Sequence, residues 1–386
     1  MGEGTRHKDV VDEIRRGSSE WILKDSYGRS VHKKLLFIGV TLLFLVITAI
    51  VSVGIGSVSI SFIDVTKSLG HAIFGSLVPL PDNQWYATIV YARSSRTVLC
   101  ILCGIALAIS GTVMQNLLRN PLVSPFTLGV SSAASFGAAM GIVFLPAIFG
   151  SAITDSIEIF GNDISLKSVL IVVCAFTCGL ASIGIVLLLS RRPNVSRSTI
   201  ILSGVIISYL FQAGISLAKY ISDDDALREI TLWLMGGMWN ATWETDILLI
   251  PIVIICFILL ECMSSNLNTL SAGDDIAKNL GVNVNRLRMR GLIISTMVTS
   301  ACISFTGIIG FIGLMAPHLC RLVIGNDSRY LIPASALVGA LILLLSDTVA
   351  RIIISPSELP VGIIMYILGG VFFIWMVSRK NKVTSL

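Results

Sequence analysis

The chain has 386 residues, of which 54% are hydrophobic and 13% are charged; its net charge is +5 and its mean hydropathy is +0.86. A soluble domain carries about 25% charged residues, so this composition excludes a water-exposed globule. Disorder, collagen and coiled coil are excluded too, because the 33 glycines and 11 prolines show no short period and apolar runs dominate. A membrane-spanning helix needs about 20 apolar residues, so the chain has room for about ten.

The polar segment 1–34 predicts a cytoplasmic N-terminal extension, because it lacks the apolar core of a signal peptide. From residue 35 on, apolar runs of membrane length alternate with short polar segments, which predicts an all-α integral membrane domain over 35–386. We expect ten transmembrane helices: 35–56, 97–117, 126–149, 168–190, 199–220, 246–263, 291–307, 308–324, 331–349 and 362–378. The seventh and eighth are short. One long span in their place would make the number of spans odd and put the two termini on opposite sides of the membrane.

The distribution of Lys and Arg predicts the orientation. With ten spans and the N-terminus inside, most of the 28 basic residues fall in inner segments, as the positive-inside rule requires. Both termini are therefore expected in the cytoplasm. The net charge reflects membrane topology, and we expect membrane lipid and no nucleic acid among the partners.

Signatures of catalysis are missing from the sequence. It contains no G-x-x-x-x-G-K-[ST] loop, so the chain does not bind and hydrolyse ATP in the P-loop manner by itself. It has no H-E-x-x-H and no paired Cys/His spacing typical of zinc. Cys100 and Cys103 form a C-x-x-C inside an apolar run, where small buried side chains are the simpler interpretation. We expect no enzyme activity, no metal ligand and no cofactor bound by this chain.

Ionisable side chains inside apolar spans are costly and mark candidate sites. Asp347 precedes Arg351 by four residues, a spacing at which two side chains meet on one helix face. We favour an internal ion pair over a proton relay. The relay remains the alternative, and it would make the protein an ion-gradient-driven secondary transporter.

The segment 265–290 is the longest charged inner connection after the N-terminal extension. Ser271–Leu280 predicts a short helix with acidic residues in its first turn, where they favour the helix dipole, and Gly281 in the C-cap position. On its own, this pattern fits a compact, structured docking element and a solvated connecting loop equally well.

Four blocks of sequence resemble, in the same order, the signature segments of the FecCD family, the type II ABC importer permeases. They are GTVMQNLLRNPLVSPFTLGVSS (111–132), LSAGDDIAKNLGV (270–282), FTGIIGFIGLMAPH (305–318) and SELPVG (357–362). The resemblance implies a ten-span protomer in a homodimer or close heterodimer, in the cell membrane. It also implies two separate ATPase subunits, which hold ATP and Mg, and an extracellular or periplasmic substrate-binding protein. The implied cargo is a metal chelate, with ferric siderophore first and cobalamin, haem or molybdate as other members' cargoes.

The resemblance also implies roles for individual residues. ATPase coupling is assigned to the segment 265–290, which we call the coupling segment, and within it to Gly273, Asp274, Asp275, Leu280 and Gly281. Docking of the binding protein falls to Arg93, Arg96 and Arg351, although the family's Arg-Leu-Pro-Arg is Arg-Ser-Ser-Arg here. The cytoplasmic gate and pathway fall to Asn194, Ser196, Ser198, Thr199, Ser203 and Ser208. For the last two serines, close helix packing and pore lining predict the same small residues.

Overall fold

The computed structural model describes residues 31–56, 58, 60–79, 81, 83–150, 155–159, 162–189 and 197–383. The first helix is Val31–Gly54, so most of the predicted extension 1–34 lies outside the described residues. The following helices are α2 (Phe62–Phe74), η1 (Gly75–Leu77), α3 (Gln84–Leu118), η2 (Pro125–Leu128), α4 (Val130–Phe149), α5 (Leu166–Leu189), α6 (Arg197–Ile221), α7 (Asp224–Met235), α8 (Trp243–Cys262), α9 (Ser264–Ser271), α10 (Asp274–Asn279), α11 (Val284–Thr306), α12 (Ile312–Ile324), α13 (Ser328–Ile352) and α14 (Val361–Val383). The short strands β1 (Ser156–Ile159) and β2 (Asn162–Ser165) form an antiparallel hairpin, with Ser156 opposite Ser165.

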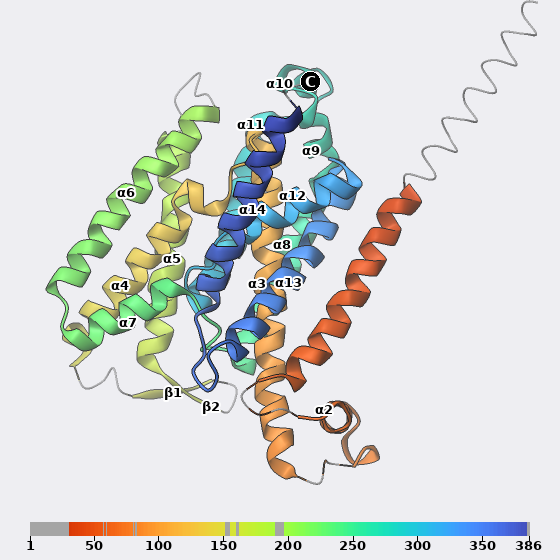
Figure 1. Ribbon diagram of the computed structural model, residues 1–386. Helices are drawn as coiled ribbons and strands as arrows, with labels where there is room; N and C mark the ends of the chain where they lie inside the picture. Colours follow the sequence, from red (N-terminus) through yellow and green to blue (C-terminus); the bar gives the residue numbers. More distant parts are fainter. Residues whose placement is uncertain are drawn as a thin grey trace, which may run out of the picture.

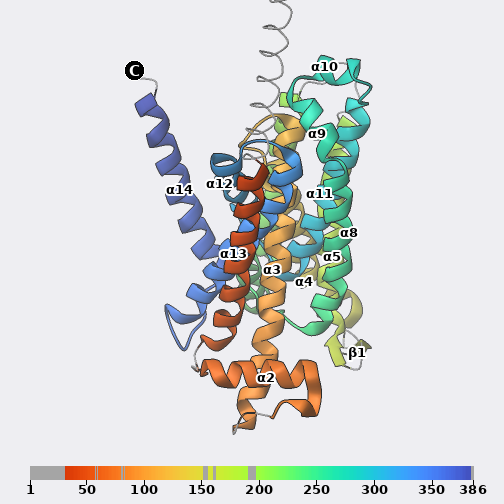
Figure 2. The same cartoon turned by 90° about the vertical axis from the view of Figure 1, so that its right-hand side faces the viewer.

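The long helices stand side by side as a bundle (Figures 1 and 2). Among the described residues, nine helices are long and apolar enough to cross a membrane, and α12 is a shorter apolar helix. Together they match the ten predicted spans, and the predicted all-helical membrane fold is confirmed apart from the small hairpin.

The two ends of the bundle differ. α9 and α10 lie at one end, and α2 and the β1–β2 hairpin lie at the other (Figures 1 and 2). The start of the first helix and the last turn of α14 both lie toward the end that carries α10, as an even number of crossings requires. We call this the coupling end and the other the far end.

Helix α3 runs through the middle of the bundle and packs against α13, α11, α12 and α8. It begins at Gln84, well before the predicted start at 97, because the side chain of Asn83 caps it and the polar stretch around Arg93 continues the helix. Glycines allow backbone contact along its length. A Cβ at Gly104 would lie 2.5 Å from Ala340 Cα, so α3 and α13 touch without intervening side chains.

The open boundary between the seventh and eighth spans is resolved as two helices. α11 ends at Thr306 and α12 begins at Ile312. Gly307 (φ 69°) and Phe311 (φ 67°) both adopt left-handed backbone conformations, which break the helix between them. The Trp233 carbonyl oxygen would lie 2.1 Å from a Cβ at Gly307, so only glycine fits this turn.

Candidate functional site

The coupling segment folds into the two short helices α9 and α10 and the first two turns of α11. α9 ends at Ser271 and α10 begins at Asp274, so the predicted helix is present but starts later than Ser271. Gly273 has φ 134°, a conformation that L side chains rarely adopt, and it makes the corner between the two helices. Gly281 (φ 85°) follows α10 and turns the chain toward α11, as its predicted capping position requires.

Buried and exposed apolar residues divide this segment into an anchored face and an outer face. Leu267, Leu270 and Ala277 are buried against the bundle. Ile276 and Leu280 are 50% and 69% exposed, although neither lies on a helix long enough to face lipid. The segment thus presents two apolar side chains outward at the coupling end, on a base that is fixed to the bundle.

Asp274 and Asp275 occupy the first turn of α10. Asp275 is exposed and lies 3.4 Å from the ammonium of Lys278, within the same helix. Asp274 is partly buried and pairs with Arg288 of α11 at 2.6 Å. The two neighbouring acids therefore have different surroundings, one facing water and one facing the bundle.

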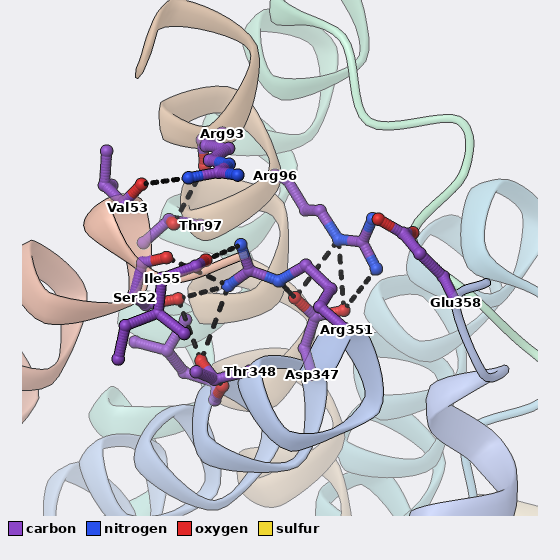
Figure 3. Close-up of polar contacts among 11 residues, drawn as sticks. Ser52, Val53, Ile55, Arg93, Arg96, Thr97, Asp347, Thr348, Arg351 and Glu358 are labelled. Atoms are coloured by element: carbon purple, nitrogen blue, oxygen red, sulfur yellow. Dashed lines mark hydrogen bonds and ion pairs between the residues drawn. The ribbon is translucent and has the colours of Figure 1, made fainter. Parts of the chain in front are cut away.

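The three predicted docking arginines come together toward the far end, in a set of charged residues shown in Figure 3. We call this set the arginine cluster; it consists of Arg93, Arg96, Asp347, Arg351 and Glu358. Arg96 donates from Nε to both carboxylate oxygens of Asp347 at 3.1 Å and from Nη2 to Oδ1 at 2.8 Å. Its Nη1 contacts Glu358 Oε2 at 2.5 Å.

Arg351 is a second cation, beside Arg96, that pairs with the buried carboxylate of Asp347. Its Nε lies 3.1 Å from Asp347 Oδ2, which confirms the predicted ion pair. The side chains of Arg351 and Asp347 are only 4% and 1% exposed. Arg351 also donates from Nη2 to Ser52 Oγ at 2.5 Å and from Nη1 to the Ile55 carbonyl at 3.1 Å. The pair therefore joins α13 to the end of the first helix (Figure 3).

Arg93 lies one turn before Arg96 on α3 and points to the same chain segment as Arg351. It donates to the carbonyl oxygens of Val53 (3.2 Å), Gly54 (3.3 Å) and Val58 (2.8 Å). All three guanidinium groups thus have partners within the chain. Their docking role stays a prediction, and what the geometry establishes is a charged junction between the first helix, α3, α13 and the segment before α14.

The predicted gate residues are only partly within the described residues. Asn194 and Ser196 lie outside them. Ser198 and Thr199 are exposed in the first turn of α6. Ser203 is buried, and Ser208 donates to the Gly204 carbonyl at 2.8 Å.

Close packing is what the small residues of α6 provide. A Cβ at Gly204 would lie 2.6 Å from Leu128 Cα, so α6 contacts η2 through backbone. Gly129, which follows η2, would bring a Cβ to 3.3 Å from Ser208 Oγ. Packing is therefore observed here, and pore lining stays a prediction.

Several residues of both ends escaped prediction from the sequence. Glu358 stands in the fourth signature block without an assigned role, and Ser52 lies in an apolar run. At the coupling end, Asn268 and Arg288 contact residues far away in the chain. Sequence spacing carried no signal for them, because their partners lie on other helices.

The fold is that of a multi-pass membrane protein with a network of charged contacts toward each end, and comparison with known proteins identifies its family. The model of the FecCD transport family matches residues 43–379, and the chain belongs to this family. The hemin transport system permease protein of Yersinia pestis is 35% identical over 350 residues, covering 91% of this chain and 97% of that protein. A vitamin B12 import system permease protein of Vibrio cholerae is 32% identical over 316 residues, covering 81% of this chain and 90% of that protein.

A solved structure agrees with the sequence relatives. It is a metal-chelate type ABC transporter in an inward-facing conformation, with 31% identity and a TM-score of 0.74 over 89% of this chain and 98% of that one. The resemblance inferred from the four signature blocks is confirmed. The chain is thus an ABC transporter permease, a class of membrane transport component that is not itself an enzyme.

Proposed function

We propose that this chain is the transmembrane permease subunit of an ABC importer that carries a ferric siderophore across the cell membrane. The observation that supports this most strongly is the family match over residues 43–379, which covers nearly all of the described bundle. Transport proceeds by alternating access. ATP binding on the partner subunits closes the coupling end and changes the side of the membrane to which the cavity opens. Both termini lie in the cytoplasm, and the coupling segment faces it.

The proposed cargo rests on the chemistry that the relatives' names share. Besides the hemin and vitamin B12 proteins, an Fe(3+)-citrate import system permease protein of Bacillus subtilis is 32% identical over 357 residues, covering 92% of this chain. These names all describe metal complexes. A ferric siderophore belongs to the same chemical class, and cobalamin, haem and molybdate are the competing cargoes.

Two ATPase subunits dock on the coupling end of a homodimer or close heterodimer. The exposed apolar residues Ile276 and Leu280 and the exposed carboxylate of Asp275 offer a contact surface, and the buried base of the segment gives it stiffness. Gly273 and Gly281 set the corners on either side of α10. ATP and Mg belong to the partners, in keeping with the missing phosphate loop.

The substrate-binding protein docks on the far end, near the arginine cluster. Arg96 shares its guanidinium between buried Asp347 and the more exposed Glu358, which lies in the loop before α14. An acidic side chain of the binding protein replaces Glu358 as the outer partner of Arg96. Such charge pairs mainly accelerate and orient association.

The arginine cluster also bears on the alternative, a secondary transporter with Asp347 as proton relay. Both oxygens of Asp347 accept hydrogen bonds from Arg96, and Arg351 adds a second positive charge. The side chain of Asp347 is 1% exposed and both carboxylate oxygens are engaged within the chain, which is the arrangement of an internal ion pair. The geometry therefore favours the importer.

Reconstitution tests the proposal. The permease is placed in liposomes alone, and in parallel with its ATPase subunits and binding protein, and uptake of an ⁵⁵Fe-siderophore is measured. We expect uptake only in the complete system and only with hydrolysable ATP. Uptake by the permease alone that collapses when the proton gradient is dissipated contradicts the proposal and supports the secondary transporter.

A further inference from the structure

A single guanidinium group links the coupling segment to two long helices. Arg288, in the second turn of α11, pairs through Nη2 with Asp274 Oδ2 of α10 at 2.6 Å. Its Nε donates to the carbonyl oxygen of Leu117 at 3.3 Å. Leu117 belongs to the last turn of α3, where carbonyl groups have no partner within the helix. Arg288 therefore joins α10, α11 and the inner end of α3.

The shape of the guanidinium makes this link stiff. Its Nε and Nη atoms lie in one rigid plane, so a displacement of Asp274 also displaces the donor that holds Leu117. A lysine at this position carries one compact ammonium group, which can follow Asp274 but gives up the directed contact to Leu117. The ion pair within α10, between Lys278 and Asp275, has no such effect because both partners move together.

A second contact fastens α9. Asn268 donates from Nδ2 to Asp327 Oδ1 at 2.7 Å, and its Oδ1 accepts the backbone N–H of Ser328 at 2.7 Å. These two residues form the N-terminus of α13. Asn116 of α3 donates to Ser328 Oγ at 3.1 Å. Asn268 thus ties α9 to α13 and, through Ser328, to α3.

Helix α3 extends from these two contacts to the arginine cluster. Between the ends, a Cβ at Gly111 would lie 1.9 Å from the Gly313 carbonyl oxygen, so α3 packs backbone to backbone on α12. Arg96 then joins α3 to α13 near the far end. Helix α3 runs from one end of the bundle to the other (Figure 1), and these contacts connect a displacement of its inner end to α12 and α13.

We propose that Arg288 and Asn268 are positioning residues that transmit movement of the coupling segment to α3 and α13. The inference rests on the proposed function, because it requires an ATPase docked on α9 and α10. It adds to that function the two side chains that convert closure of the ATPase into displacement of transmembrane helices. Neither residue touches cargo or nucleotide in this role.

The test compares variants of the full chain in liposomes with the ATPase subunits and the binding protein. Three quantities are measured: ATPase subunits that co-purify with the permease, ATP hydrolysed, and iron-siderophore taken up per ATP. In Arg288→Gln and in Asn268→Ala we expect co-purification and hydrolysis to persist while uptake per ATP falls about tenfold, the loss of one charge-assisted or bidentate contact. Arg288→Lys should fall between Arg288→Gln and the unmodified chain.

Lys33→Gln is the charge control, because it removes an exposed positive charge near the start of the first helix, at the same end. Its uptake per ATP should match that of the unmodified chain. If Arg288→Gln does not yield a folded complex, Arg288→Lys and Asn268→Ala carry the test.

Unchanged uptake per ATP in Arg288→Gln and Asn268→Ala overturns the inference. Parallel loss of co-purification and uptake also overturns it, since it assigns these residues to the docking surface instead. Failure of the proposed function is distinguishable, because the unmodified chain would then neither retain the ATPase subunits nor show ATP-dependent uptake.

Discussion

Asp347→Asn removes the negative charge from the arginine cluster and should destabilise the protein by about 3 kcal/mol. Removing one partner of a buried ion pair costs about 3–5 kcal/mol, because the other charge stays buried without compensation. Arg351 is 4% exposed, so its positive charge would stay buried without its carboxylate partner. Arg96 retains Glu358 and some contact with solvent, which places the cost at the lower end of the range. Reversible unfolding in mixed micelles with increasing SDS, followed by circular dichroism, measures the free-energy change.

A double variant supplies the control for this prediction. Asp347→Asn combined with Arg351→Met removes the stranded guanidinium together with its partner. Its loss of stability should be smaller than the sum of the two single losses, because the two residues are coupled. A cost of Asp347→Asn below about 1 kcal/mol, or additive losses, would refute the interpretation of the cluster as a buried, charge-compensated junction.

Two further predictions concern a closely packed glycine compared with one that has open space, and an ion pair that is exposed to solvent. Gly111→Ala should cost about 3 kcal/mol in the same unfolding assay, because its Cβ would lie 1.9 Å from the Gly313 carbonyl oxygen, whereas Gly184→Ala has open space and should stabilise by about 0.5–1 kcal/mol. An equal effect of the two would contradict the close contact of α3 with α12. Glu229→Gln should change stability by less than about 1 kcal/mol, because the 2.6 Å pair with Lys167 is 31% and 40% exposed; a larger loss would mean that the pair is screened from water.

How much of this structure the sequence predicts depends on the range of each interaction. Long apolar runs fix the spans, because lipid demands a continuous apolar surface and internally satisfied backbone. The Asp347–Arg351 pair followed from spacing within one helix. Arg96 was found only as a member of a resemblance, and its contact with Asp347 joins residues 251 positions apart. Local patterns carry no information at that distance.

Elements outside the spans were the hardest to predict. α2 and the β1–β2 hairpin are short and lie in connections, where neither apolar length nor charge marks a boundary. The early start of α3 was missed because the predicted span followed only the apolar run from 97. The helix in fact begins at Gln84 and includes Arg93, whose guanidinium donates to neighbouring carbonyl groups. Arg288 was counted only as a basic residue of an inner segment. Its position between α10 and α3 emerges from tertiary packing.

The central claim is that separate ATPase subunits drive this permease by binding α9 and α10 from the cytoplasm. Cross-linking from residue 280 tests this claim most directly. A photo-reactive amino acid replaces the exposed Leu280 in cells that express the whole transporter. Irradiation should produce a covalent adduct with the ATP-binding-cassette subunit, and a membrane-impermeant reagent should fail to reach a cysteine at this position in intact cells. Labelling of that cysteine from outside, with no ATPase adduct, would contradict the claim.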